Sequence, residues 1–180
     1  MNTRVTILAA AIALAGCTTV PPATSNDDSD DIMASVALVP KSGSNVSGSL
    51  HVMAMGDGVH VSGSISGLAP NSAHGFHIHE TGNCGTPDAS SAGGHFNPTH
   101  EAHGRAAASP HHLGDQDNIV ADASGVARVD AHFAGATLGK GKASDVLGKA
   151  VIVHADPDDY TSQPSGNAGK RIACGVITPG

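Results

Sequence analysis

The sequence predicts an all-β domain, built as a sandwich or barrel, that carries two long functional loops. Short runs of strand-like residues are separated by turn signals at short intervals, as in sheet proteins. The 180 residues include no tryptophan, one tyrosine and three phenylalanines. The core must therefore consist of Val, Ile, Leu and Ala, which favours short strands over large helices. Two long stretches rich in Gly, Pro, Ser and Asn lack strand patterning, and such loops are uncommon unless they have a function.

The strands are expected in chain order at residues 34–39, 48–55, 59–68, 75–80, 118–121, 125–133, 149–154 and 172–177. Gly56-Asp57-Gly58 joins the second run to the third and is a hairpin signal. The two loops are residues 81–117 and 155–170.

The amino terminus, residues 1–16, has the features of a signal peptide of the lipoprotein type. Arg4 precedes an apolar run, residues 5–14, that is too short to span a bilayer as a stable helix. The run ends in Leu14-Ala15-Gly16-Cys17, which resembles the bacterial lipobox, where lipid is attached to the cysteine before cleavage. The sequence thus predicts a membrane anchor on Cys17 and a periplasmic location; a free or disulfide-bonded cysteine is the alternative.

Residues 17–32 are expected to form a flexible acidic linker, because they are polar, contain two prolines and could bury little surface. The folded domain then covers residues 33–180. It carries 8 basic and 12 acidic side chains, a net charge of −4. This balance argues against a nucleic-acid partner.

Most of the twelve histidines lie between His74 and His154. In the stretch Gly75 to Glu80, apolar and imidazole side chains alternate, so a strand would place His77 and His79 on one face. Neutral imidazole is the commonest protein ligand for zinc and copper. The pair is a candidate half of a metal site; taken alone, it could equally be a solvent-facing pair.

The first loop contains a second candidate metal-binding set. His95, His103, His112 and Asp115 are spaced by eight, nine and three residues. Three imidazoles and one carboxylate would give zinc a closed shell of four ligands, which is typical of a structural site. His154 ends a strand-like run, where it is either a further ligand or a surface histidine.

With these motifs in place, the chain resembles a copper/zinc superoxide dismutase of the bacterial secreted type. The resemblance covers roughly residues 35–177, and its signatures stand at residues 75–80, 94–98, 112–115 and 166–177. It implies a Greek-key β-sandwich or flattened barrel of about eight strands. It further implies one copper and one zinc ion per subunit.

Carried over residue by residue, the resemblance assigns both metal shells. The copper ligands are expected to be His77, His79, His95 and His154. The zinc ligands are expected to be His95, His103, His112 and Asp115, so that His95 bridges the two metals. Asp158 is expected to link a copper ligand to a zinc ligand, here His77 and His103, and so to orient both rings.

The implied reaction converts superoxide to oxygen and hydrogen peroxide, with copper as the redox centre, and Arg171 would hold the anion near it. Once Cys17 carries lipid, Cys84 and Cys174 remain as an even pair in a compartment where disulfides persist, and in the family these two are bonded. A homodimer is left open.

Two other functions are alternatives to the dismutase. A lipid-anchored periplasmic module that stores copper or zinc without turnover is the main alternative, and a zinc hydrolase is a weaker one.

A separate surface also carries possible metal ligands. His51, Met53 and Met55 share one face of a predicted strand, with His60 across the hairpin. Thioether and imidazole suit copper(I), so this face is a candidate copper-loading patch; a dimer contact or plain exposed surface are its alternatives.

Overall fold

The computed structural model describes Met1 and residues 32–180. The predicted signal peptide, Cys17 and nearly all of the acidic linker lie outside the described residues. Within the described chain, no helix is long and apolar enough to cross a membrane. The described strands are β1 Met33–Pro40, β2 Ser47–Met55, β3 Gly58–Ser66, β4 Ala73–His74, β5 Phe76–His79, β6 Ile119–Val120, β7 Ala127–Ala134, β8 Ala150–His154, β9 Arg171–Val176 and β10 Thr178–Pro179. One helical turn, η1, covers Ser90–Ala92.

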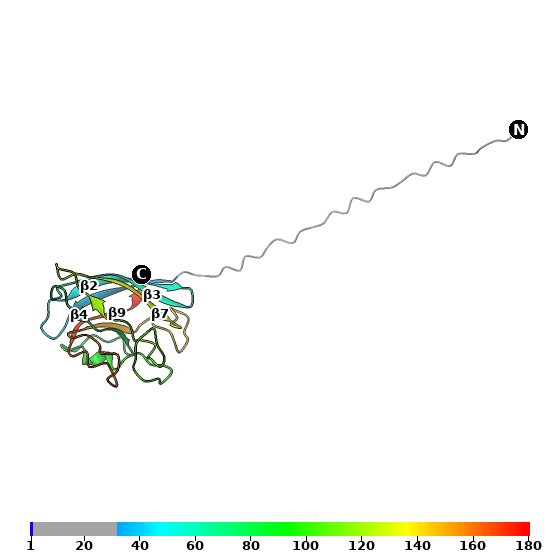
Figure 1. Ribbon diagram of the computed structural model, residues 1–180. Coiled ribbons are helices and arrows are strands. Elements are labelled where there is room, and N and C mark those ends of the chain that lie inside the picture. The colour runs from blue at the N-terminus through cyan, green and yellow to red at the C-terminus, as the bar shows by residue number, and fades with distance from the viewer. Residues whose placement is uncertain (2–31) are drawn as a thin grey trace.

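The strands form an eight-stranded antiparallel sheet that curls on itself, as the all-β prediction required (Figure 1). The order is β5-β8-β9-β1-β2-β3-β7, and β10 pairs with β1. β4 and β6 form a separate two-stranded sheet. Because β1 pairs with both β2 and β9, the curl brings the two halves of the sheet face to face around a single apolar core.

Alternation of side chains between the two faces of a strand explains the burial pattern of β7. In β7, buried and exposed residues alternate without exception, and Val129 and Phe133 point inward. In β5 and β8 every residue is buried, because the first loop covers the face of these strands that points away from the core. That covered face carries His77 and His79, so their burial follows from the loop above them.

The predicted strands are present, with small differences at several bounds and two short strands, β4 and β10, that were not predicted. β3 ends at Ser66 and not at residue 68, because Gly67 has a φ of +83° and turns the chain. The predicted strand at residues 118–121 is reduced to the two residues of β6, which pair with a strand that was not predicted, β4.

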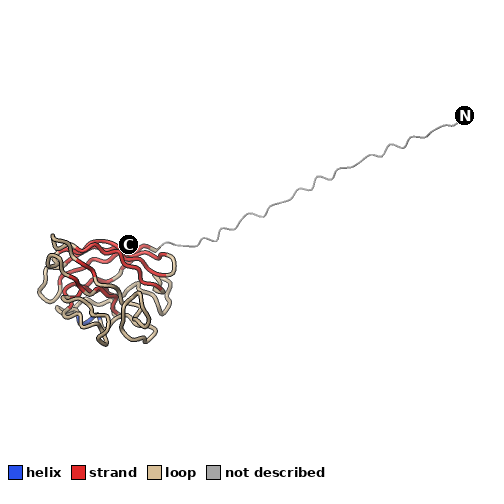
Figure 2. Tube along the Cα trace, in the orientation of Figure 1, coloured by secondary structure: helices blue, strands red, loops and turns tan. Residues whose placement is uncertain are grey.

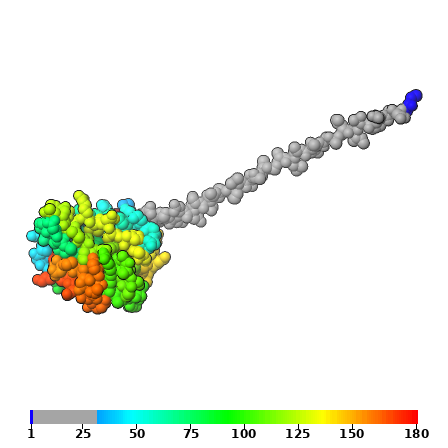
Figure 3. All heavy atoms as spheres, viewed as in Figure 1, coloured from blue at the N-terminus to red at the C-terminus, as the bar shows by residue number. Residues whose placement is uncertain are grey.

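The two long loops lie side by side on one flank of the sheet (Figure 2; the green and orange regions in Figure 3). Gln163 of the second loop accepts a hydrogen bond from the His103 amide and donates one to its carbonyl, each 2.9 Å long. Gly166 allows this close approach: its φ is +66°, and a Cβ there would overlap the Asp158 carboxylate and the His103 ring.

The expected disulfide between Cys84 and Cys174 is present, with 5.8 Å between the two Cα atoms. It ties the first loop to β9, and Cys174 is fully buried beneath η1 and its flanking residues. The bond closes a stretch of 90 residues, so it should restrict the unfolded chain strongly.

Replacing both cysteines by alanine is expected to lower the free energy of unfolding by about 4 to 5 kcal/mol, the loss of loop-closure entropy for a ring of this size. Urea denaturation of the oxidised wild type and the double variant measures the difference. A difference near zero, or two free thiols in the oxidised wild-type protein, would contradict the structural role of this bond.

Candidate metal centre

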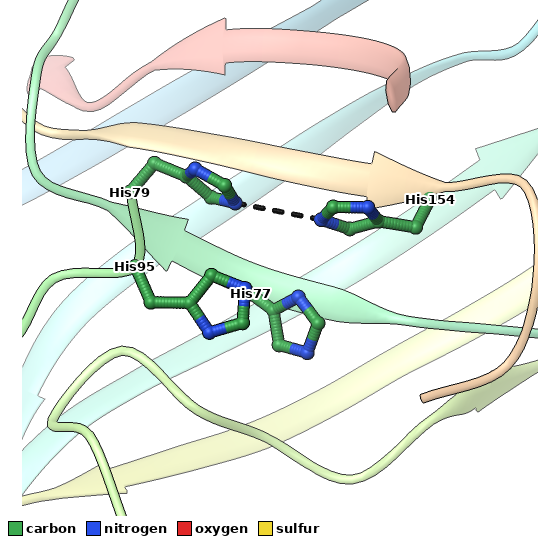
Figure 4. Close-up of side chains that lie close together, drawn as sticks. All are labelled: His77, His79, His95 and His154. Carbon is green, nitrogen blue, oxygen red and sulfur yellow. Dashed lines mark hydrogen bonds between the residues drawn. The ribbon is translucent and has the colours of Figure 1, made fainter. Parts of the chain in front are cut away.

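Four histidines from three separate segments converge on one point. His77 and His79 project from β5, His154 ends β8, and His95 lies on the first loop, bridged to His79 (Figure 4). One ring nitrogen from each lies within 4.8 Å of the others, and all four residues are buried. The Nε2 atoms of His79 and His154 are 3.4 Å apart. The structure therefore brings together all four residues predicted as copper ligands.

The second predicted set also converges. His95, His103, His112 and Asp115 offer one ligand atom each within 4.8 Å. The Oδ1 atom of Asp115 lies 2.7, 3.0 and 3.3 Å from the Nδ1 atoms of His95, His103 and His112. Its Oδ2 atom accepts the amide hydrogens of His112 and Gly104. The carboxylate is thus fixed through one oxygen and presents the other to three imidazoles.

His95 belongs to both groups because its two ring nitrogens face in different directions. Nδ1 faces Asp115, and the ring centroid of His95 lies 4.1 Å from that of His77 and 5.3 Å from that of His103. A single imidazole that occupies both groups has the placement required of a bridge between two ions.

In His77, His79 and His103, a hydrogen bond to the nitrogen that does not face the cluster sets the orientation of the ring. His79 Nδ1 donates to the Gly93 carbonyl at 3.0 Å. The Asp158 carboxylate accepts from His77 Nε2 at 2.7 Å and from His103 Nε2 at 3.0 Å. Asp158 therefore joins the two groups as predicted, and it leaves the Nδ1 atoms of both rings for a metal.

The donor set passes a simple test of fit for metal ions. Within the described chain, four buried side-chain nitrogens have no hydrogen-bond partner, and all belong to the two groups: His77 Nδ1, His95 Nε2, His103 Nδ1 and His112 Nδ1. A buried polar atom without a partner costs about 1 to 3 kcal/mol. Metal coordination would satisfy all four. Four imidazoles suit copper, and three imidazoles with one carboxylate suit zinc.

Three rings of the first group, those of His79, His95 and His154, are held in the neutral form that a metal requires. Burial lowers the pKa of His79 and of His154 well below its usual value, and neighbouring imidazoles lower it further. Burial also lowers the pKa of His95 to about 4, although the hydrogen bond to Asp115 acts in the opposite direction. These rings are neutral at pH 7 and need lose no proton before they coordinate an ion.

The second group has the opposite electrostatic character. Burial would raise the pKa of Asp115, but the imidazoles of His103, His112 and His95 next to its carboxylate hold it well below its ordinary value. Burial would lower the pKa of His103, yet the carboxylates of Asp115 and Asp158 outweigh it and raise that pKa to about 9. The metal-free site therefore holds a proton on His103 that a zinc ion would displace.

The first group opens onto a pocket of about 610 Å³. His79, His95 and His154 line it together with Arg171; of the other members of the second group, His112 also lines it, whereas His103 and Asp115 do not. Arg171 donates to the carbonyls of Ala89 at 2.7 Å and Gly93 at 2.6 Å, which hold its guanidinium at the pocket wall. The first group, called the copper-type group below, is thus accessible from the pocket. The carboxylate of the second group, called the zinc-type group below, is enclosed.

Two contributors to the site were not predicted. The Gly93 carbonyl orients both His79 and Arg171, and this role of a backbone atom cannot be inferred from the residue type. His100 of the first loop also lines the pocket.

In this all-β domain, one buried imidazole is shared between an open four-histidine group and an enclosed group of histidines and an aspartate. This arrangement defines a protein that binds two metal ions. Comparison with known proteins identifies its family. Residues 46–177 match the family model for copper/zinc superoxide dismutase. The chain belongs to the copper/zinc superoxide dismutase family, a family of enzymes that bind copper and zinc.

Individual relatives agree with this assignment. The chain is 42% identical over 152 residues to superoxide dismutase [Cu-Zn] 2 of Aquifex aeolicus, covering 83% of this chain and 88% of that protein. It is 42% identical to superoxide dismutase [Cu-Zn] 2 of Mesembryanthemum crystallinum, covering 81% and 95%. The crystal structure of a superoxide dismutase-like protein from Bacillus subtilis superposes with a TM-score of 0.72 at 38% identity, covering 79% of this chain and 97% of that one.

The metal-free protein is expected to lose stability as the pH falls from 7 to 5. His79, His95 and His154 have lowered pKa values in the folded state, so below about pH 6.5 the unfolded chain binds more protons than the folded one. Each ring can cost up to about 1.4 kcal/mol per pH unit in that range. His103, whose pKa is raised, stabilises the fold below pH 6.5 and loses this effect only as the pH rises through about 9.

Urea denaturation of the metal-free protein at several pH values checks this. The slope between pH 7 and 5 should shrink in a His79→Gln variant, in which one of the titrating rings is absent. A free energy of unfolding that stays constant or rises on acidification would contradict the assignment of neutral, buried imidazoles.

Proposed function

We propose that this chain catalyses the dismutation of superoxide to oxygen and hydrogen peroxide. In this proposal His77, His79, His95 and His154 hold copper, and His95, His103, His112 and Asp115 hold zinc. The observation that carries the proposal is the complete four-imidazole group opening onto a pocket whose wall also carries Arg171. Membership of the family supports it independently.

When bound, copper supplies a one-electron couple: one superoxide gives up an electron and leaves as oxygen, and a second superoxide takes that electron and, with two protons, leaves as hydrogen peroxide. The protein must therefore bind an anion twice and deliver two protons. Arg171 supplies the anion contact, because two of its N–H groups are committed to carbonyls while the guanidinium still faces the pocket.

His95 provides a place for one of the protons. Its Nε2 atom is buried, has no hydrogen-bond partner in the described chain and faces the copper-type group. A nitrogen in this position can hold either the metal or a proton, and Asp115 keeps the ring in place through Nδ1 in both cases. Asp158 fixes the rings of His77 and His103 and thereby maintains the spacing of the two groups.

The zinc-type group has the character of a structural site. It is made of loop residues, its four members would fill a tetrahedral shell, and its carboxylate lies away from the pocket. Zinc there would order the loop that carries His95. The same closure disfavours a zinc hydrolase, which needs an open position on the ion.

The alternative of metal storage without turnover calls for a direct test, since one relative is known by the name superoxide dismutase-like protein. The experiment measures metal content and superoxide removal by the same preparation of the copper/zinc-loaded protein and of the metal-free protein. Turnover that rises in proportion to bound copper supports the enzyme. Full copper occupancy without turnover would establish the storage function.

Replacing His154 by alanine is expected to reduce superoxide turnover by about 100-fold or more, since even the loss of an outer partner of a ligand costs 10- to 100-fold. Copper analysis and a superoxide-decay assay measure both effects. His51→Ala removes an exposed histidine outside both groups and should leave the rate unchanged. Equal rates for the wild type and His154→Ala would refute the ligand assignment.

Replacing Arg171 by glutamate should slow the reaction without changing copper content. The folded domain carries a net charge of −4, so attraction of an anion must come from the local field around Arg171. The wild-type rate should fall as ionic strength rises towards 0.15 M, where screening acts beyond about 8 Å. The variant should lose or invert this dependence.

Lys142→Glu makes the same charge change at an exposed loop position outside the pocket and serves as the control. If both variants shift the rate and its salt dependence equally, Arg171 has no special guiding role.

We further propose that the mature protein is a periplasmic lipoprotein anchored through Cys17, as the sequence Leu14 to Cys17 indicates. Cys17→Ser should abolish incorporation of labelled fatty acid and release the protein into the soluble fraction. Cys84→Ala controls for the general loss of a cysteine. Unchanged membrane association and labelling of Cys17→Ser would exclude this anchor.

A further inference from the structure

A straight row of sulfur and imidazole side chains crosses the outer face of the sheet. Met33 of β1 lies directly opposite Met53 of β2, Met53 opposite His60 of β3, and His60 opposite His132 of β7. Directly opposite residues of antiparallel strands share a face, with Cβ atoms about 4.5 to 5.5 Å apart. Met53 and His60 belong to the candidate copper-loading patch indicated by the sequence, and Met33 joins them only through the pairing of β1 with β2.

The row points away from the core. Its strand neighbours Ala34, Val52 and Val61 are buried, whereas the Met33 side chain is 55% exposed. It is also separate from the metal centre, whose ligands come from β5, from the end of β8 and from the first loop. In Figure 1, β2 and β3 lie in the upper layer, on the side of the molecule away from the long loops.

Three of the four residues form a compact donor set. Met33 and Met53 are directly opposite each other and line one small surface hollow together with Ile32 and Ala54. His60 lies beside Met53 on the other flank. Its Nε2 atom lies 2.6 Å from Oδ1 of Asp130, which leaves Nδ1 free and gives the ring the carboxylate partner typical of metal-binding histidines.

The fourth residue, His132, lies too far from the two methionines to share one ion with them. It stands on β7, and three strand spacings of about 4.8 Å separate it from Met33. Met55 shares the face but lies two residues further along β2, opposite Gly58, and does not line the hollow.

Two thioethers and one imidazole are soft, uncharged donors, which select copper(I) over zinc and over hard divalent cations. We propose that Met33, Met53 and His60 form a surface site for one copper(I) ion, separate from the copper and zinc positions of the buried centre. The site does not depend on superoxide turnover. It gives the protein a second place to hold copper, on the face opposite the loops.

The test titrates the copper/zinc-loaded protein with silver(I), a redox-inert probe of copper(I) sites, while NMR follows methionine methyl groups labelled with carbon-13. The signals of Met33 and Met53 should shift together and saturate at one equivalent, and the Met55 signal should remain in place. Titration calorimetry should show that His60→Gln and Met53→Leu each weaken silver(I) binding about tenfold or more.

His132→Gln and Met55→Leu are the matched controls, each removing the same chemical group from the same face, and both should bind like the wild type. The superoxide rate of all four variants should equal that of the wild type, so failure here is distinct from failure of the proposed activity. Absence of the methyl shifts, or binding that His60→Gln leaves unchanged, would overturn the site. Self-association abolished by Met53→Leu, without a silver(I) response, would assign the row to a contact between two copies and also overturn it.

Discussion

Buried imidazole nitrogens without hydrogen-bond partners are the constraint on which this structure depends. Four such atoms lie within the two described groups, at His77, His95, His103 and His112. Each would cost about 1 to 3 kcal/mol if left unsatisfied, a large fraction of the stability of a domain of this size. The loops that enclose them are held by the Cys84–Cys174 bond and by Asp158, so the fold maintains a strained arrangement that metal ions would relieve.

The two groups differ in what surrounds them, and this difference divides their roles. In the open group, burial keeps His79, His95 and His154 neutral, and the group shares a pocket with Arg171. The enclosed group contains an ionised carboxylate next to three imidazoles. Its rings can hold either protons or a metal ion. His95 is the only ring common to both groups among the described residues, so any movement of the first loop changes both at once.

Much of this could be predicted from the sequence, because strand alternation and the spacing of histidines are local. Period two places His77 and His79 on one face without knowledge of the fold, and most strand bounds follow from the turn signals. The meeting of the two loops could not be derived in this way, since Gln163 contacts His103 across 60 residues. The role of the Gly93 carbonyl and the position of Met33 opposite Met53 depend on backbone path and register, which residue type does not encode.

The central claim is that His95 bridges two metal ions. A crystal structure of the copper/zinc-loaded protein, with diffraction data on both sides of each metal's absorption edge, tests it most directly. Copper is expected beside Nε2 and zinc beside Nδ1 of His95, with the zinc at about 2.0 to 2.1 Å from that nitrogen and Asp115 on the zinc only. A structure in which His95 contacts a single ion, or in which one metal occupies both groups, would contradict it.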